Sequence, residues 1–155
     1  MRHLRWGKWA HLVGRVMLLK IVVCIKQVPV VSRITFDYER LTIVRDGVPL
    51  EVNSFDMLAV DRAVKIAQEE DGEVVVYTMG PAQAREALVQ CLALGADRAV
   101  HLTDLAMVGA DTLATARALS MALERENPDL VICGRNSTDA ETGQVGPEIA
   151  ELLGL

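Results

Sequence analysis

Two continuous apolar runs constrain this chain more than any other feature, because each is bounded by charge or polarity and leaves no polar face. The first covers residues 20–26, Lys-Ile-Val-Val-Cys-Ile-Lys, and the second covers residues 73–79, Glu-Val-Val-Val-Tyr-Thr-Met. Strands with apolar side chains on both faces are typical of a parallel sheet that lies between two layers of helices. We therefore expect an α/β fold.

The rest of the chain alternates in the same way. Further strands are expected at 98–103 and 129–133, and a last helix at 145–153. Earlier helices are expected at Asn53-Ser-Phe-Asp56, whose polar residues either cap the helix or line a crevice, after Gly80-Pro81, and at Asp111, also a cap. Alternating units with short turns predict a doubly wound parallel sheet. Each of the four helices is expected to carry one apolar stripe. In chain order, the stripe of the first helix is Phe55, Ala59, Ala63, Ile66 and Ala67, and that of the second is Ala84, Leu88, Cys91 and Leu92. The stripe of the third is Ala114, Ala118, Met121 and Ala122, and that of the last is Val145, Ile149, Leu152 and Leu153.

One segment departs from this alternation. Residues 34–52 alternate loosely between apolar and polar side chains and contain Asp46-Gly47, a turn dipeptide. We expect a β-hairpin, or a pair of short edge strands, inserted after the first strand.

Both ends of the chain look unlike its middle. Residues 1–16 hold both tryptophans and four basic residues with no acid. We interpret them as a non-native leader or a mis-called start, with Met17 as the natural first residue and an α/β domain over 17–155. The stripe of the last helix needs a sheet to cover, so we expect this domain to be incomplete at its C-terminal end.

Charge and cysteine usage exclude some function classes. The formal charge is −5, and the four basic residues of the leader leave −9 for the remainder, which argues against nucleic acid as a partner. No run is long enough for a transmembrane segment. Cys24, Cys91 and Cys133 have no metal-ligand spacing, so we expect free thiols, no metal site, and a reducing, cytoplasmic location.

The segment 134–147 is the strongest candidate for a ligand site. It follows an expected strand and leads into an expected helix, where free N–H groups and the helix dipole favour an anion such as phosphate. Gly143 and Gly146 permit close approach of the backbone, and Pro147 fits a first helical turn. Side-chain donors are supplied by Ser137, Thr138, Thr142 and Gln144. The alternative is an ordinary polar connection, although the segment is long for one.

Signs of catalysis are missing from the sequence. It has no GxGxxG after the first strand and no P-loop. The Ser-rich, Gly-rich loop that follows the first strand in ATP-cleaving members of the adenosine-binding α/β folds is also missing. His101 is interpreted as a strand residue because no nucleophile is placed beside it. Asp139 and Glu141 either cap the backbone or bind a ligand hydroxyl. Binding is therefore predicted, and whether the protein is an enzyme stays open.

Six ordered motifs together resemble one known family. They occupy residues 22–29, 46–48 with Asn53, 78–83, 93–97, 109–115 and 134–147. From about Met17 to Leu155 the chain is similar to the beta subunit of electron-transfer flavoproteins. The resemblance implies a Rossmann-like, adenosine-nucleotide-binding fold in a heterodimer with an alpha subunit that carries the electron-transferring FAD.

The resemblance also implies where a second adenine nucleotide binds. The residues carried over are Cys24, Asn53, Ser54, Phe55, Asp56, Met79, Gly134, Asn136, Ser137, Thr138, Asp139, Thr142, Gly143, Gln144 and Val145. They cover strand ends and helix starts at one edge of the expected sheet. None is assigned a catalytic role.

The identity of the nucleotide is left between FAD and AMP. Residues 139–147 resemble the short loop of bifurcating members, which hold a second FAD, but Asn136-Ser-Thr138 and Glu141-Thr-Gly143 depart from the usual Gln-Ala-Ile and Asp-Thr-Ala. The implied partners are the alpha subunit, acyl-CoA dehydrogenases, and, for the bifurcating type, NADH and ferredoxin or flavodoxin. The competing hypothesis is a stand-alone adenine-nucleotide sensor of the universal-stress kind.

Overall fold

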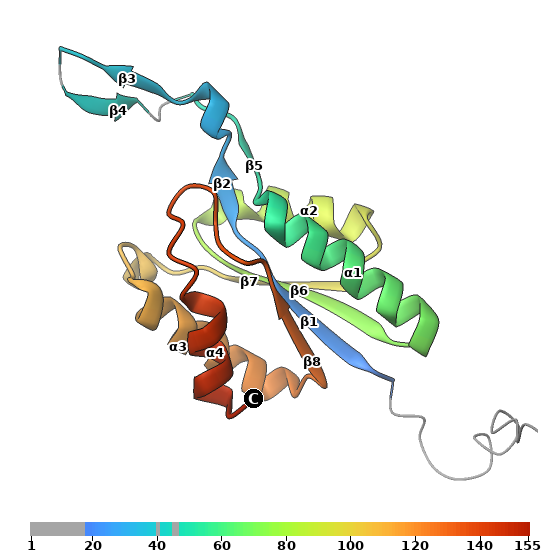
Figure 1. The fold of residues 1–155 in the computed structure, drawn as a ribbon. Helices are drawn as coiled ribbons and strands as arrows, with labels where there is room; N and C mark the ends of the chain where they lie inside the picture. The colour runs from blue at the N-terminus through green and yellow to red at the C-terminus, as the bar shows by residue number, and fades with distance from the viewer. Residues whose placement is uncertain (1–17, 40, 45–46) are drawn as a thin grey trace, which may run out of the picture.

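The central sheet has four parallel strands in the order β7-β6-β1-β8. The computed structural model describes residues 18–39, 41–44 and 47–155. The four strands are β1 Lys20–Cys24, β6 Glu73–Met79, β7 Arg98–Leu102 and β8 Leu130–Cys133. From β1 the chain moves outward to β6 and β7 and then returns to the other side of β1 for β8 (Figure 1). The reversal of strand order lies between β1 and β8, where open α/β sheets bind their ligands.

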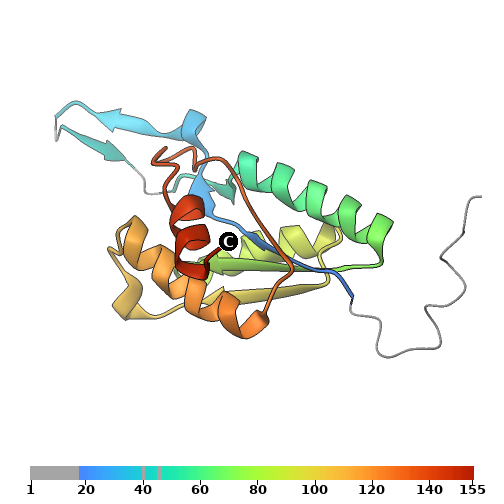
Figure 2. The same ribbon diagram turned by 60° about the horizontal axis from the view of Figure 1, so that its bottom comes forward.

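Two helices cover each face of the sheet. Helices α1 Ser54–Glu70 and α2 Arg85–Ala93 lie on one face, and α3 Thr112–Glu126 and α4 Val145–Leu153 lie on the other (Figure 2). Short 3₁₀ turns at Val31–Arg33, Ala82–Ala84 and Leu105–Met107 complete the helical segments.

Strand β1 shows why its apolar run has no polar side. Its residues alternate between the two cores: Ile21 and Val23 pack with α1 and α2, whereas Val22 and Cys24 pack with α3 and α4. The expected doubly wound α/β fold is confirmed, as are most element boundaries to within two residues.

The predictions of which helix residues are buried are partly wrong. In α3, Ala114 is exposed and Met121 is 63% exposed, while the buried residues are Ala116, Leu119, Ser120 and Leu123. Small apolar residues occur all round this helix, so the pattern alone leaves its rotation undetermined. Leu92 in α2 and Leu152 in α4 are also exposed, although Ile149 is buried as expected.

The insertion after β1 is a narrow antiparallel arm. Strand β2 Gln27–Pro29 pairs with β5 Leu50–Val52, and farther out β3 Thr35–Asp37 pairs with β4 Thr42–Val44. The arm projects away from the sheet in Figure 1. A hairpin is confirmed, but the chain reverses between β3 and β4. Asp46 of the expected turn lies outside the described residues, as does the expected leader at 1–16.

Among the described helices, none combines the length and apolar character that crossing a membrane requires.

Candidate functional site

The candidate site lies at the carboxyl ends of β1 and β8. The loop 134–144 leaves β8, passes over the end of β1 toward the start of α1, and returns to begin α4 (Figure 1). Its position at the topological switch point is the one expected for a ligand crevice. Three side chains, Asn53, Asp56 and Lys26, tether this loop.

Asn53 is the most buried of these anchors, with only 1% of its surface exposed. Its Nδ2 donates to the carbonyl of Asn136 at 2.9 Å, and its Oδ1 accepts from the Thr138 N–H at 3.2 Å. Asn53 stands at the N-cap position of α1, but its side chain makes no capping hydrogen bond. The expected cap is therefore wrong, because the amide reaches the loop instead.

Asp56 joins the ends of β1 and β8. Its Oδ2 accepts from the Lys26 N–H at 2.8 Å, and the Gly134 N–H donates to the same carboxylate. Burial raises the pKa of Asp56 to about 6, although these hydrogen bonds oppose the shift. A Cβ at position 134 would overlap the Asp56 carboxylate, so only glycine permits this approach.

Lys26 holds the tip of the loop through an ion pair. Its Nζ lies 2.7 Å from Oδ1 and 2.9 Å from Oδ2 of Asp139, and donates to Ser137 Oγ at 3.4 Å. Burial acts to raise the pKa of Asp139, but the hydrogen bonds from Lys26 and Ser137 and the charge of Lys26 together outweigh it, and the pKa is lowered. Both side chains are partly exposed, so we expect the pair to contribute little to stability.

The remaining residues at the start of α1 and on β6 are more open. The Phe55 ring lies under the guanidinium of Arg135, 5.0 Å from its centroid, and Ser54 is exposed. Met79 lies at the end of β6, one strand away from the β1–β8 crevice, on the face covered by α3 and α4. The structure therefore gathers Cys24, Asn53, Asp56 and the first half of the loop, with Met79 at the periphery.

The second half of the loop leads into α4. Gly143 has φ +63°, and Glu141 has φ +56°. Gln144 does not cap α4 with its side chain; its Oε1 lies 2.9 Å from the Thr112 hydroxyl, which is also 3.2 Å from Glu148 Oε1. Thr142 is exposed, and Val145 packs against the core beneath α4. The role of the α4 start as an anion site stays a prediction.

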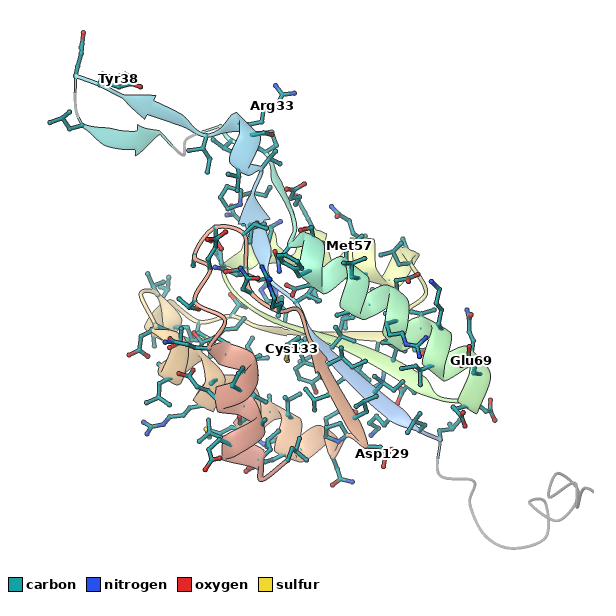
Figure 3. All side chains as sticks on the ribbon, viewed as in Figure 1. Arg33, Tyr38, Met57, Glu69, Asp129 and Cys133 are labelled. Carbon is teal, nitrogen blue, oxygen red and sulfur yellow. The ribbon has the colours of Figure 1, made fainter. Side chains whose placement is uncertain are left out.

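Cys24 ends β1 and Cys133, labelled in Figure 3, ends β8, and these two strands flank the switch point. They are partners in the parallel register, and both side chains lie in the core beneath α3 and α4. Hydrogen bonding from the Cys24 thiol favours the Cys133 thiolate and so lowers the pKa of Cys133. The same interaction favours the protonated form of Cys24 and, together with burial, raises the pKa of Cys24. The sequence predicts three separate free thiols and does not bring Cys24 and Cys133 together. The only available signal was that Cys24 and Cys133 each close an apolar run.

An open cleft of about 540 Å³ continues from the site along the free edge of β8. It shares Gly134 and Gly143 with the predicted site residues. Its lining is Val131, Cys133, Gly134, Arg135, Gly143, Gly146, Pro147, Ile149, Ala150 and Leu155.

The described residues place no cluster of three or more His, Cys, Asp or Glu side chains around a metal position. His101 is a strand residue, as expected. Its Nε2 lies 3.0 Å from the Gly80 carbonyl oxygen at the carboxyl edge.

This arrangement defines a class of protein: a Rossmann-like, doubly wound α/β domain with a polar loop over its topological switch point. The chain matches the electron transfer flavoprotein domain over residues 40–155. It belongs to the electron transfer flavoprotein family, and its relatives in that family are beta subunits.

Curated relatives agree with this assignment. The electron transfer flavoprotein subunit beta of Thermoanaerobacterium thermosaccharolyticum is 47% identical over 88% of this chain and 53% of its own length. Protein FixA of Sinorhizobium fredii is 45% identical over 88% of this chain and 50% of its length. The caffeyl-CoA reductase-Etf complex subunit CarD of Acetobacterium woodii is 44% identical over 87% of this chain and 52% of its length. The chain thus spans about half the length of the curated relatives it matches.

A solved universal stress protein in complex with cAMP is also similar, with a TM-score of 0.44 and 18% identity over 85% of this chain and 87% of that one. At that level the likeness adds nothing to the identification.

Proposed function

We propose that this chain contributes the nucleotide site of an electron-transfer flavoprotein beta subunit and holds FAD or AMP in the crevice between β1 and β8. The full-length protein pairs with an alpha subunit that carries the electron-transferring FAD, and together they pass electrons between redox partners. The proposal assigns binding to the α/β domain expected over 17–155, and it assigns no catalytic residue.

One observation carries the proposal. The loop 134–144 is held over the switch point by contacts that come from far away in the sequence: Asn53, Asp56 and Lys26 reach it from the other side of the crevice. An ordinary connection has no need of a buried asparagine and a buried carboxylate at its base. A loop that must present its backbone to a phosphate does need such support.

Within this proposal, FAD is favoured over AMP by the short form of the loop, which ends at Gln144-Val-Gly-Pro147. A second FAD makes the complex an NADH-oxidising, bifurcating one that sends electrons to ferredoxin or flavodoxin as well as to the alpha subunit. AMP makes it a carrier for acyl-CoA dehydrogenases. In both cases we place the protein in the cytoplasm.

The nucleotide content of the full-length complex tests the proposal. The protein is purified with its alpha subunit, denatured, and its released nucleotides are separated and quantified. Two flavins per complex support the FAD form, and one flavin with one AMP supports the AMP form. One flavin with no further adenine nucleotide contradicts the proposed site.

The stand-alone universal-stress-like sensor, which the sequence analysis left open, is disfavoured by the family match over residues 40–155. Such a sensor would bind its nucleotide without an alpha subunit. Retention of nucleotide by the full-length chain in the absence of any partner would support it.

A further inference from the structure

We propose that Cys24 and Cys133 are a peroxide-sensitive thiol pair, which closes to a disulfide beneath the start of α4 and thereby displaces the ligand of the neighbouring crevice. The first part rests on the geometry of the two residues alone. The effect on a ligand rests on the proposed function as well.

The two residues are placed to be joined. They are register partners on adjacent parallel strands, and both side chains lie in the core between the sheet and the α3–α4 layer. Adjacent strands are about 4.8 Å apart, within the Cα separations of disulfides, roughly 4.4–6.8 Å. Both are free cysteines in this structure.

The surroundings make the two thiols unequal. Cys133 is half-buried and lines the cleft along β8, so a small oxidant reaches it, whereas Cys24 is only 9% exposed. The bond from Cys24 lowers the pKa of Cys133, which favours its thiolate. Cys133 is therefore the residue that reacts first, and Cys24 is the one that resolves the product.

One molecule of hydrogen peroxide oxidises the two thiols to one disulfide. The Cys133 thiolate attacks a peroxide oxygen, the O–O bond breaks, and hydroxide leaves to become water, which gives a sulfenic acid at Cys133. The Cys24 sulfur then attacks Cys133 Sγ, the S–O bond breaks, and hydroxide departs as a second water with the Cys24 proton. Two thiols are oxidised by two electrons and one peroxide is reduced to two waters.

The first step prepares the second. The pKa of Cys24 is raised chiefly by its interaction with Cys133, and burial adds to the effect. Once Cys133 is a neutral sulfenic acid, no thiolate remains there to accept the Cys24 proton in a hydrogen bond or to repel a second negative charge, so Cys24 ionises more readily.

The pair supports the start of α4. A Cβ built at Gly146 would lie 3.3 Å from Cys133 Cβ and 3.8 Å from Cys133 Sγ, so the first turn of α4 rests directly on this side chain. Rotation of Cys133 toward Cys24 removes part of that support. Because Cys24 also belongs to the predicted crevice, we expect the oxidised protein to release most of its nucleotide.

Peptide mapping of the full-length protein tests the pair. Reduced protein is treated with hydrogen peroxide, its remaining thiols are alkylated, and it is digested with trypsin. Peptides 21–26, 86–98 and 126–135 each contain one cysteine, Cys24, Cys91 and Cys133 respectively. We expect a linked product of peptides 21–26 and 126–135, lighter by two hydrogens than their sum, that dithiothreitol reverses.

Cys91 provides a matched control. It is fully buried in the opposite core, and burial raises its pKa to about 11. Cys91→Ser keeps the cross-link, whereas Cys24→Ser and Cys133→Ser lose it. Sulfinic acid at Cys133 beside a free Cys24 thiol, or oxidation of Cys91 as fast as Cys133, overturns the proposal.

Nucleotide content measured on the same samples separates the two proposals. A cross-link without nucleotide loss overturns the proposed displacement. A reduced protein that carries no adenine nucleotide beyond the alpha-subunit FAD contradicts the proposed function, while the cross-link still decides the chemistry of the thiols.

Discussion

Asn53 and Asp56 lie at the start of α1, but their side chains hydrogen-bond to other segments instead of capping the helix. The Asn53 amide bonds the loop at Asn136 and Thr138, and the Asp56 carboxylate accepts from the N–H groups of Lys26 and Gly134. By contrast, Asp111 caps α3 as expected, accepting from the Ala114 N–H at 2.8 Å. Asn53 and Asp111 both occupy N-cap positions, yet only Asp111 caps its helix, because the loop 134–144 lies opposite Asn53.

Replacing Asn53 with alanine should loosen the loop 134–144. Two hydrogen bonds are lost and buried loop groups are left without partners, so we expect a loss of about 1–3 kcal/mol in unfolding free energy. Hydrogen exchange should show faster exchange at Thr138. Asp111→Ala is the control: it costs about 1 kcal/mol through α3 and leaves exchange in the loop unchanged. Equal protection of the loop in both variants would show that Asn53 does not tether it.

The raised pKa of Asp56 predicts how the unfolding free energy depends on pH. Because the folded-state pKa of about 6 lies above the ordinary aspartate pKa of 3.8, the native state keeps a proton that the unfolded chain loses between these values. The stability due to Asp56 is therefore fully present below pH 3.8 and is lost as pH rises through 6. The full loss is about 3 kcal/mol.

Urea unfolding between pH 4 and pH 8 measures this loss. Asp56→Asn cannot ionise, so its unfolding free energy should fall less steeply with rising pH than that of the wild type over this window. Parallel curves for the two proteins would contradict the raised pKa. The lowered pKa of Asp139 acts in the opposite direction, so Asp139→Asn serves as a comparison.

At the scale of elements, the connection from β8 to α4 combines backbone constraint with ligand chemistry. Gly143 has φ +63°, and a Cβ there would lie 3.4 Å from the Arg135 carbonyl oxygen. Gly143→Val should therefore destabilise even the nucleotide-free protein, by about 1–2 kcal/mol, as well as weaken nucleotide retention.

Thr142→Val separates these two effects. The residue is exposed and loses only a hydroxyl, so we expect normal stability with nucleotide binding weakened by about 1 kcal/mol. The exposed Glu151 of α4 provides a control, Glu151→Gln, which should change neither quantity. Wild-type affinity in Thr142→Val would remove this hydroxyl from the site.

The same element scale shows where sequence patterns succeed. Strand β6 is found at Glu73–Met79, as predicted, because an apolar run rich in β-branched residues is typical of a parallel strand that is covered on both faces. Helix α3 has the expected limits but a different buried face, because its small apolar residues surround it. Only the sheet and α4 decide which of them are covered.

For the whole molecule, nucleotide binding should increase the free energy of unfolding. A ligand that binds only the folded state at about 100 times its Kd adds about 2.7 kcal/mol to the unfolding free energy. We expect this gain for the full-length, nucleotide-depleted complex with FAD or AMP, and little gain with GMP. Thermal unfolding at several ligand concentrations measures it. Equal shifts with AMP, FAD and GMP would indicate binding to phosphate without recognition of adenine.

The sequence by itself determined the α/β class, the limits of most elements, and the position of the polar loop after β8. These follow from local causes: apolar runs, helix caps and turn residues act within a few positions of one another. The tertiary structure alone decided that β8 lies beside β1, that Asn53 meets Asn136, and that Cys24 meets Cys133. Each of these contacts joins residues more than eighty positions apart. Such contacts depend on the order of strands in the sheet, which local patterns do not encode because the same strands and helices are compatible with more than one order.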